Sequence, residues 1–276
     1  MTSFLSNIRA GFTPPSPEDL LDFLQPTFPW LEQLGETPQD PEWHAEGNVK
    51  THTLMVIDET YRLLETNDFP PEERVILCLA AALHDIGKTV RTREEVIDGK
   101  IRIVSPRHAV TGRHYIAPRL ASLPVSPSEF HQILGLVGHH HDVLTLLHRK
   151  RTKNAFYRLS RAVSLPLLKA LEEADIRGRI CQDREEKLEL LDLFQMEAQS
   201  FGTWENADCY SEWQSIIETE TQSPRQMNFV LNEAKIDFEL NKIYSPEEAI
   251  ARCYQTSKSH SHVTLTCGPS GSGKST

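Results

Sequence analysis

The feature that most constrains the fold of this chain is the helical spacing of its apolar residues. Apolar side chains recur three and four positions apart over long stretches, the spacing that keeps them on one face of an α-helix. The period predicts helices at about 49–66, 71–86, 106–122, 127–144, 153–163, 166–177 and 184–200, with weaker ones near 208–219 and 246–256. Asp98-Gly99 separates two short apolar runs within 95–104 and predicts a hairpin with a type I′ turn. We therefore expect an all-α bundle with one small β-hairpin.

Proline content and polarity suggest where the parts of the chain begin and end. Seven prolines lie in residues 1–42, so we expect an irregular segment over 1–35. The helical domain is expected over 36–220, because polar residues near 219–226 interrupt the period. Residues 221–258 then form a linker or helical extension, and 259–276 begin a truncated α/β domain.

Charge and composition restrict the class of protein. The net charge of −10 argues against a protein that coats nucleic acid without selection. Lys and Arg nevertheless occur without any Asp or Glu in 99–128 and 143–171, which suits either a phosphate-bearing substrate or solvated helix faces. The longest apolar run, Val75–Leu83, is too short to span a membrane. Five cysteines without paired spacing predict reduced thiols in a cytoplasmic protein.

Several predicted helices carry histidine or aspartate on the apolar face. A single inward histidine is usually a hydrogen-bonded core residue. Several such groups on different helices are hard to satisfy by one another, whereas one divalent cation satisfies them together. Imidazole with carboxylate favours Mn²⁺, Fe²⁺, Co²⁺, Ni²⁺ or Zn²⁺ over Ca²⁺, and coordination positions left for water predict a hydrolytic site. The candidate ligands are His52, His84, Asp85, His108, His140 and Asp175, with His141 at the edge of its stripe.

Three stretches show this pattern in order: "EWHAEGNVKTHT" (42–53), "LHDIGK" (83–88) and "EADIRGR" (173–179). They resemble the HD phosphohydrolase superfamily, an all-helical family of metal-dependent phosphatases, nucleotidases and phosphodiesterases. The resemblance is strongest to the HD domain attached to some bacterial tRNA nucleotidyltransferases and covers about 42–200. It implies that the pattern H…HD…D falls on His52, His84-Asp85 and Asp175. Members with two metals imply further ligands at His108 and His140, and the triple histidine 139–141 leaves open which of the three binds.

The resemblance also implies substrate contacts. Lys88 is placed to stabilise charge on phosphoryl oxygens, although a solvated lysine at a helix end is the alternative. Arg177 and Arg179 could hold a phosphate with two hydrogen bonds or form surface salt bridges. Of the two, Arg177 is expected to offset the negative charge that develops, together with Lys88. His44 and Glu46 match a Trp-His-x-Glu motif of the nucleotidyltransferase-linked domains. Their role is substrate contact, protonation of the leaving group, or anchoring of a loop.

The chain closes on a glycine loop. Residues 268–275 fit G-x-x-x-x-G-K-[ST], and the apolar "HVTLTC" before them predicts the strand that such a loop follows. The helix, the Walker B acid and the lid of a kinase are missing, so no kinase activity is expected of this chain as it stands. Residues predicted to bind ATP and Mg²⁺ are Gly268, Gly271, Gly273, Lys274, Ser275 and Thr276.

An HD domain followed by such a loop resembles the bifunctional bacterial RNA end-healing enzymes, in which an HD phosphohydrolase is fused to a polynucleotide 5′-kinase. The resemblance implies removal of 2′,3′-cyclic phosphate or 2′/3′-phosphate from RNA ends, with one or two divalent transition-metal ions. One alternative is an HD nucleotidase or phosphodiesterase on small nucleotides, fused to an unrelated P-loop ATPase. Another is a nucleotide-sensing regulatory domain, which the intact doublet, Asp175 and Lys88 argue against.

Overall fold

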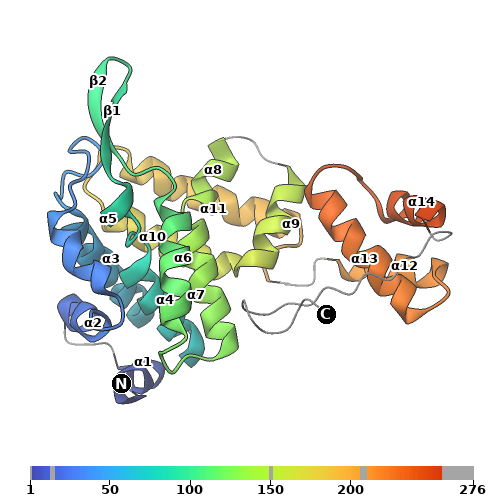
Figure 1. Ribbon diagram of the computed structural model, residues 1–276, viewed down its shortest axis with the longest axis horizontal. Coiled ribbons are helices and arrows are strands. Elements are labelled where there is room, and N and C mark those ends of the chain that lie inside the picture. Colours follow the sequence, from blue (N-terminus) through green and yellow to red (C-terminus); the bar gives the residue numbers. More distant parts are fainter. Residues whose placement is uncertain (1, 13–15, 149–151, 206–209, 257–276) are drawn as a thin grey trace, which may run out of the picture. The chain divides into compact units, whose positions relative to one another are not determined.

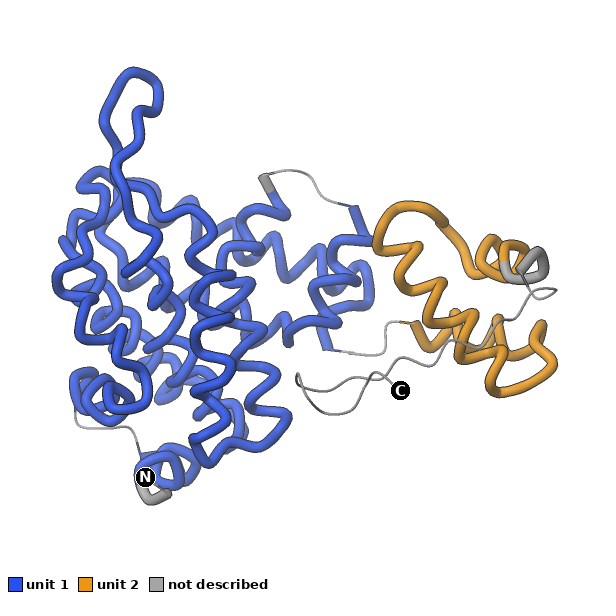
Figure 2. Tube along the Cα trace, in the orientation of Figure 1, with its two compact units in different colours: residues 1–207 blue, residues 208–276 orange. Residues whose placement is uncertain are grey.

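A computed structural model describes residues 2–12, 16–148, 152–205 and 210–256. The chain forms two compact units, residues 1–207 and 208–276 (Figure 2). The predicted boundary at residue 220 therefore falls inside the second unit. The glycine-loop residues 268–276 and the predicted strand before them lie outside the described residues.

The described part of residues 1–35 is mainly helical, so the predicted irregular structure is wrong. It forms α1 (Thr2–Arg9), α2 (Pro17–Leu24) and the start of the 3₁₀ helix η1 (Pro29–Glu36). Pro17 and Pro29 lie in the first turn of their helices, where a missing N–H breaks no hydrogen bond. Apolar side chains from all three helices join the main hydrophobic core of the first unit. Pro17 and Pro29 therefore start helices, although the large number of prolines in this segment had suggested irregular structure.

The rest of the first unit is the expected helical bundle with one hairpin (Figure 1). Four of the main predicted helices, α3, α9, α10 and α11, begin and end within one residue of their predicted bounds. The helices are α3 (Val49–Thr66), α4 (Pro71–Leu83), α5 (Lys88–Arg91), α6 (His108–Leu120), α7 (Pro127–His139), α8 (Asp142–His148), α9 (Lys153–Ala162), α10 (Leu165–Arg177) and α11 (Arg184–Ser200).

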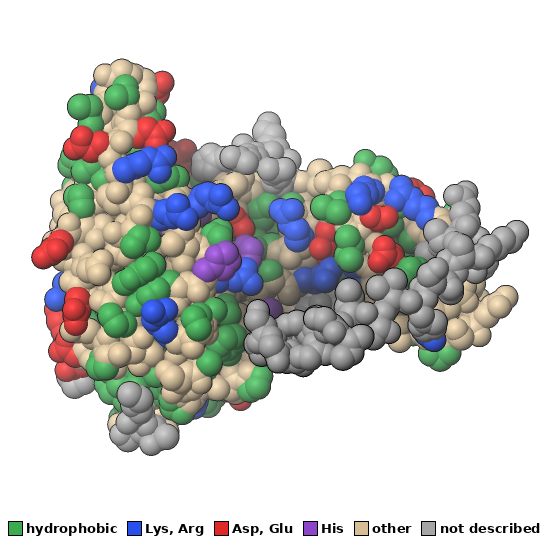
Figure 3. Space-filling view, in the orientation of Figure 1, with side chains coloured by type: hydrophobic (Ala, Val, Ile, Leu, Met, Phe, Trp, Pro, Cys, Tyr) green, Lys and Arg blue, Asp and Glu red, His purple; other side chains and the backbone are tan. Residues whose placement is uncertain are grey.

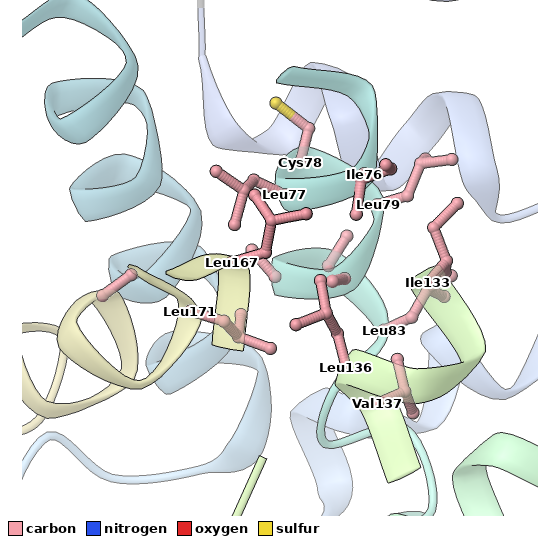
Figure 4. Packing of buried hydrophobic residues seen from close by; sticks show 14 of the residues in the cluster. Ile76, Leu77, Cys78, Leu79, Leu83, Ile133, Leu136, Val137, Leu167 and Leu171 are labelled. Carbon is pink, nitrogen blue, oxygen red and sulfur yellow. The ribbon is translucent and has the colours of Figure 1, made fainter. Parts of the chain in front are cut away.

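Helix α4 lies at the centre of the bundle. Every residue from Val75 to Leu83 is buried, and the helix packs against α3, α7 and α10. Figure 4 shows Ile76 and leucines of α4 packed against apolar side chains of α7 and α10. A helix buried on all sides is apolar all round, which explains why its sequence lacks a polar face. Its C-terminal end therefore delivers His84 and Asp85 to the interior.

Two predicted helices end earlier than expected, and both ends fall at candidate ligands. The helix predicted over 71–86 stops at Leu83, and the one predicted over 127–144 divides into α7 and α8. Adjacent residues of a continuous helix point in directions about 100° apart. The turn between α7 and α8 instead brings the rings of His140 and His141 to a centroid distance of 4.2 Å.

The predicted hairpin is confirmed and extends away from the helices (Figure 1). Strands β1 (Arg93–Ile97) and β2 (Lys100–Val104) pair antiparallel. Asp98 and Gly99 both have positive φ, 50° and 76°, as a type I′ turn requires.

The second unit is built from α12 (Ser211–Glu220), α13 (Pro224–Glu239) and α14 (Pro246–Thr256), which contact one another. The described part of the segment expected as a linker or helical extension, 221–258, is thus mostly helix. Ser223 accepts a hydrogen bond from the backbone N–H of Gln226, and Pro224 follows it, a helix start that the sequence contained.

None of the described helices combines the length and apolarity that crossing a bilayer demands.

Candidate metal centre

The predicted ligands meet in the interior of the first unit. They come from α3, from the turn after α4, from the start of α6, from the turn between α7 and α8, and from α10. Most are buried, and Figure 3 shows histidine side chains emerging at the surface beside Lys and Arg. The residues brought together are His52, His84, Asp85, His108, His140, His141 and Asp175.

Backbone carbonyls fix the tautomer of three of these histidines. The Nδ1 atoms of His84, His108 and His140 each lie 2.7–2.9 Å from the carbonyl oxygen of the residue three positions earlier. A carbonyl only accepts, so each Nδ1 must carry the proton and donate. Each Nε2 is then left with a lone pair, the form in which imidazole binds a metal.

The carboxylate of Asp85 connects the imidazoles. Its Oδ1 lies 3.0 Å from Nε2 of His108 and 3.7 Å from Nε2 of His140. Its Oδ2 lies 3.3 Å from Nε2 of His84 and 3.7 Å from Nε2 of His52. One carboxylate therefore faces both groups of histidines.

Several of these atoms are buried without a hydrogen bond. They are Nε2 of His52, Nε2 of His84 and both carboxylate oxygens of Asp85. Of these atoms, Oδ2 of Asp85 does face a cation, the ammonium of Lys88 at 2.7 Å. Nε2 of His108 lies 3.1 Å from Nε2 of His140. Both of these nitrogens carry a lone pair and no proton, so neither can donate a hydrogen bond to the other. Unsatisfied buried acceptors are costly, and one divalent cation would satisfy the imidazoles and the carboxylate together. The donor set thus fits a divalent transition metal.

Three groups of donors among the described residues have ligand atoms within 4.8 Å of one another. They are His52, His84 and Asp85; His108, His140 and His141; and His44, Glu46 and His52, which shares His52 with the first group. His139, by contrast, is directed to Asp142, with Nδ1 2.8 Å from its Oδ2. Of the triple histidine, His140 and His141 therefore face the cluster.

Asp175 completes the first group. Its Oδ1 lies 2.9 Å from Nε2 of His52, and Arg179 donates to both of its oxygens at 2.8 and 2.9 Å. Burial alone would raise the pKa of Asp175, but Arg179 and His52 outweigh it and hold the pKa well below the usual range. Lys88 acts on Asp85 in the same way, with Nζ 2.7 Å from Oδ2. Burial would raise the pKa of Asp85, yet Lys88 and the nearby histidines keep it well below its usual range.

Glu46 orients His52 from behind. Its Oε1 lies 3.0 Å from Nδ1 of His52 and 2.7 Å from Nδ1 of His44, and its Oε2 accepts from the N–H of Ile180 at 2.9 Å. Burial would raise the pKa of Glu46, but these donors lower it below the usual range. A carboxylate that holds the Nδ1–H of a ligand is the usual outer partner in metal sites.

The predicted substrate residues divide into two sets. His44 and Lys88 line a cavity of about 430 Å³ beside the cluster, together with His108, His141 and Arg179. Burial is the main cause that lowers the pKa of His44 to about 4, against the effect of Glu46. Arg177 is not among the residues that line this cavity.

Arg177 is exposed, pairs with Glu173 at 2.8 Å and lines a separate cavity that includes Glu59 and Arg62. Arg179 is the arginine that reaches the cluster, because it lies one helical turn beyond Asp175. The sequence led us to expect Arg177 at the substrate, whereas the arginine that lines the cavity beside the cluster is Arg179.

Two further residues of the cavity were missed. Gln39 is 8% exposed, and its Oε1 accepts from Nζ of Lys88 at 2.8 Å. Trp43 is 42% exposed and lines the same cavity. Trp43 precedes His44 in the matched motif and could have been found there, whereas Gln39 lies in a proline-containing stretch with no pattern.

Comparison with known proteins agrees with this geometry. The model of the HD domain family matches residues 49–182, which include every proposed metal ligand. The multifunctional CCA protein of Thioalkalivibrio sulfidiphilus is 31% identical over 161 residues, 55% of this chain and 35% of the relative. That of Psychromonas ingrahamii is 29% identical over 122 residues, 44% of this chain and 25% of the relative. That of Methylococcus capsulatus is 41% identical over 71 residues, 26% of this chain and 15% of the relative.

The chain thus spans about a third or less of the length of these curated relatives. The order of the candidate ligands in the sequence, their meeting in the structure and the family match all indicate the same domain. This chain carries an HD domain of the metal-dependent hydrolase superfamily, and its candidate metal centre lies within residues 49–182.

Proposed function

We propose that this HD domain hydrolyses phosphate esters at RNA ends, namely 2′,3′-cyclic phosphate or 2′/3′-phosphate. The observation that carries the proposal is the set of buried Nε2 and carboxylate atoms without a hydrogen bond. Asp85 of this set contacts Lys88 and His108, which line a cavity together with Arg179. A centre that only stabilised the fold would have no need of a cavity with two cations in its wall.

The proposed ligands are His52, His84, Asp85 and Asp175 for one ion, and His108, His140 and His141 for a second. A divalent ion of the Mn, Fe, Co, Ni or Zn series would supply Lewis-acid activation of water and of the phosphoryl group. Lys88 and Arg179 would offset the negative charge that develops on the phosphoryl oxygens. His44 would contact the substrate from the cavity wall.

The similarity of this chain to known proteins supports RNA as the substrate. The matched relatives are multifunctional CCA proteins, which agrees with the resemblance of the sequence to HD domains attached to tRNA nucleotidyltransferases. The glycine loop at 268–275 adds the resemblance to RNA end-healing enzymes, in which ATP and Mg²⁺ serve a 5′-kinase. We propose that this loop belongs to such a kinase domain.

The proposal has a direct test. An RNA oligonucleotide ending in 2′,3′-cyclic phosphate is incubated with the protein loaded in turn with Mn²⁺, Fe²⁺, Co²⁺, Ni²⁺ or Zn²⁺, beside Asp85→Ala. We expect hydrolysis by the wild type with at least one ion and loss of that hydrolysis in the variant. No turnover of this RNA with any ion would contradict the proposal.

The same assay separates the alternatives. Hydrolysis of mononucleotides without hydrolysis of RNA would favour a nucleotidase. Metal and nucleotide binding without turnover would favour a sensor. Arg177→Ala serves as the matched control, because its side chain lies outside the cavity.

A further inference from the structure

One wall of the cavity is a loop tied to the hairpin. Asp40 accepts hydrogen bonds from the N–H of Ile103 at 3.3 Å and from Arg102 at 3.1 Å. Arg102 also pairs with Glu42 at 2.5 Å. Asp40 is 3% exposed, so these bonds are sheltered from water and hold the loop and β2 together. The wall is built from two segments about 60 residues apart in sequence.

Trp43 presents an aromatic surface from this wall. The guanidinium carbon of Arg102 lies 5.0 Å from the centroid of its ring, which braces the ring by a cation–π contact. No aromatic ring of the described residues packs against Trp43, which is 42% exposed. An indole that is braced on one side and open to a cavity is an unusual use of a large apolar side chain.

Gln39 gives an independent sign that this part of the cavity takes a ligand. The ammonium of Lys88 can only donate, so the bond between Nζ and Oε1 fixes which end of the amide faces it. Nε2 of Gln39 is then a buried donor without a partner. Because an unsatisfied buried donor is costly, the site calls for an acceptor oxygen at that point.

We propose that this wall is a nucleoside subsite, in which the base of the terminal nucleotide stacks on Trp43 and an oxygen of the same nucleotide accepts from Gln39. The subsite rests on the proposed function, since it would hold the nucleotide whose phosphate lies at the metal centre. The cavity volume of about 430 Å³ lies within the range of about 300–1,000 Å³ of small-molecule sites. Stacking tolerates every base, so we expect little preference among the four.

A kinetic test compares two cyclic phosphodiesters, adenosine 2′,3′-cyclic phosphate and glycerol 1,2-cyclic phosphate, which lacks a base. Trp43→Ala is expected to raise KM for the nucleotide about tenfold or more, with kcat changed less than about twofold. Trp43→Phe is expected to restore most of the affinity, and KM for the glycerol ester is expected to stay the same. An unchanged KM for the nucleotide, or equal rises for both esters, would overturn the subsite.

A binding test needs no turnover. Adenosine 2′-monophosphate is expected to quench tryptophan fluorescence of the metal-loaded wild type through contact with Trp43. Trp43→Phe is expected to abolish the saturable quench, whereas the control Trp213→Phe, in the second unit, keeps it. Quenching that depends on Trp43 in a protein that hydrolyses no phosphoester would preserve the subsite and refute the proposed function. Quenching that persists in Trp43→Phe would refute the subsite alone.

Discussion

Among single residues, Glu46 shows how far the centre depends on groups that would not touch the ion. It accepts from two imidazoles and one backbone N–H, and it fixes the proton of His52 on Nδ1. The carbonyls behind His84, His108 and His140 do the same for their rings. The tautomers are thus set before a ligand arrives.

Replacing Glu46 tests this arrangement. In Glu46→Gln the charge is lost and one amide must replace an acceptor shared by two histidines, so we expect metal affinity to fall about 10- to 100-fold. Calorimetric or competition titration with Zn²⁺ measures it. The control is Glu42→Gln, whose side chain is 60% exposed and pairs with Arg102. Equal affinities of wild type and Glu46→Gln would contradict the role.

The two arginines near the end of α10 offer a second comparison. Arg179→Ala removes the partner of Asp175 and a cation of the cavity, so we expect hydrolysis to fall on the order of 100-fold. Arg177→Ala removes an exposed pair with Glu173, and its rate is expected to stay within about twofold. Rates on the cyclic-phosphate RNA check both. A greater loss in Arg177→Ala than in Arg179→Ala would show that the wrong arginine has been placed at the site.

Among the elements, the turn that carries His84 and Asp85 approaches α6 closely at Gly87. A Cβ built on Gly87 would lie 2.2 Å from the carbonyl oxygen of His108 and 2.7 Å from the N–H nitrogen of Gly112. Only glycine allows the two backbones to approach this closely. The approach is what brings His108 to within 3.0 Å of Asp85.

Gly87→Ala must therefore push α6 away from the turn. We expect a loss of about 2 kcal/mol or more in the free energy of unfolding, together with weaker metal binding. Urea denaturation and metal titration measure the two effects. Gly35→Ala is the matched control, because its Cβ would meet only Cδ of Lys50 at 3.8 Å. If Gly87→Ala were as stable as Gly35→Ala, the backbone contact would not constrain the fold.

On the scale of the whole molecule, all proposed ligands and the cavity lie in the first unit, residues 1–207. That unit has its own continuous core, to which the three N-terminal helices contribute. The second unit has a small core of its own, which includes Tyr210, Ile217 and Phe238.

A fragment of residues 1–207 is therefore expected to fold and to keep the hydrolytic activity within about twofold. Circular dichroism and the RNA assay check this. Loss of cooperative unfolding in the fragment would mean that the first unit depends on the second.

Metal removal should also be visible in the stability of the first unit. An ion that binds the folded state alone stabilises it, by about 2.7 kcal/mol when its concentration is 100 times Kd. Chelation by EDTA is thus expected to lower Tm, and Asp85→Ala should show a smaller response. A Tm that does not respond to chelation in the wild type would argue against a bound ion.

Much of this protein follows from the sequence alone. The 3.6-residue period marks the helices, Asp98-Gly99 marks the hairpin turn, and the inward polar residues mark the candidate ligands. These signals are local, because they depend on spacing along one element. The prediction for the prolines was wrong for the same reason. Proline usually interrupts a helix, and only the structure shows that Pro17 and Pro29 lie in the first turn of one, where proline is favoured.

Only the tertiary structure decided how those elements meet. It separated His140 and His141 from His139, chose Arg179 over Arg177, and brought Gln39 and Trp43 to the wall of the cavity. Each choice depends on the direction of a side chain relative to another element, set by a turn or a close backbone contact such as that at Gly87. Periodicity gives the face of a helix, and packing between helices gives what that face meets.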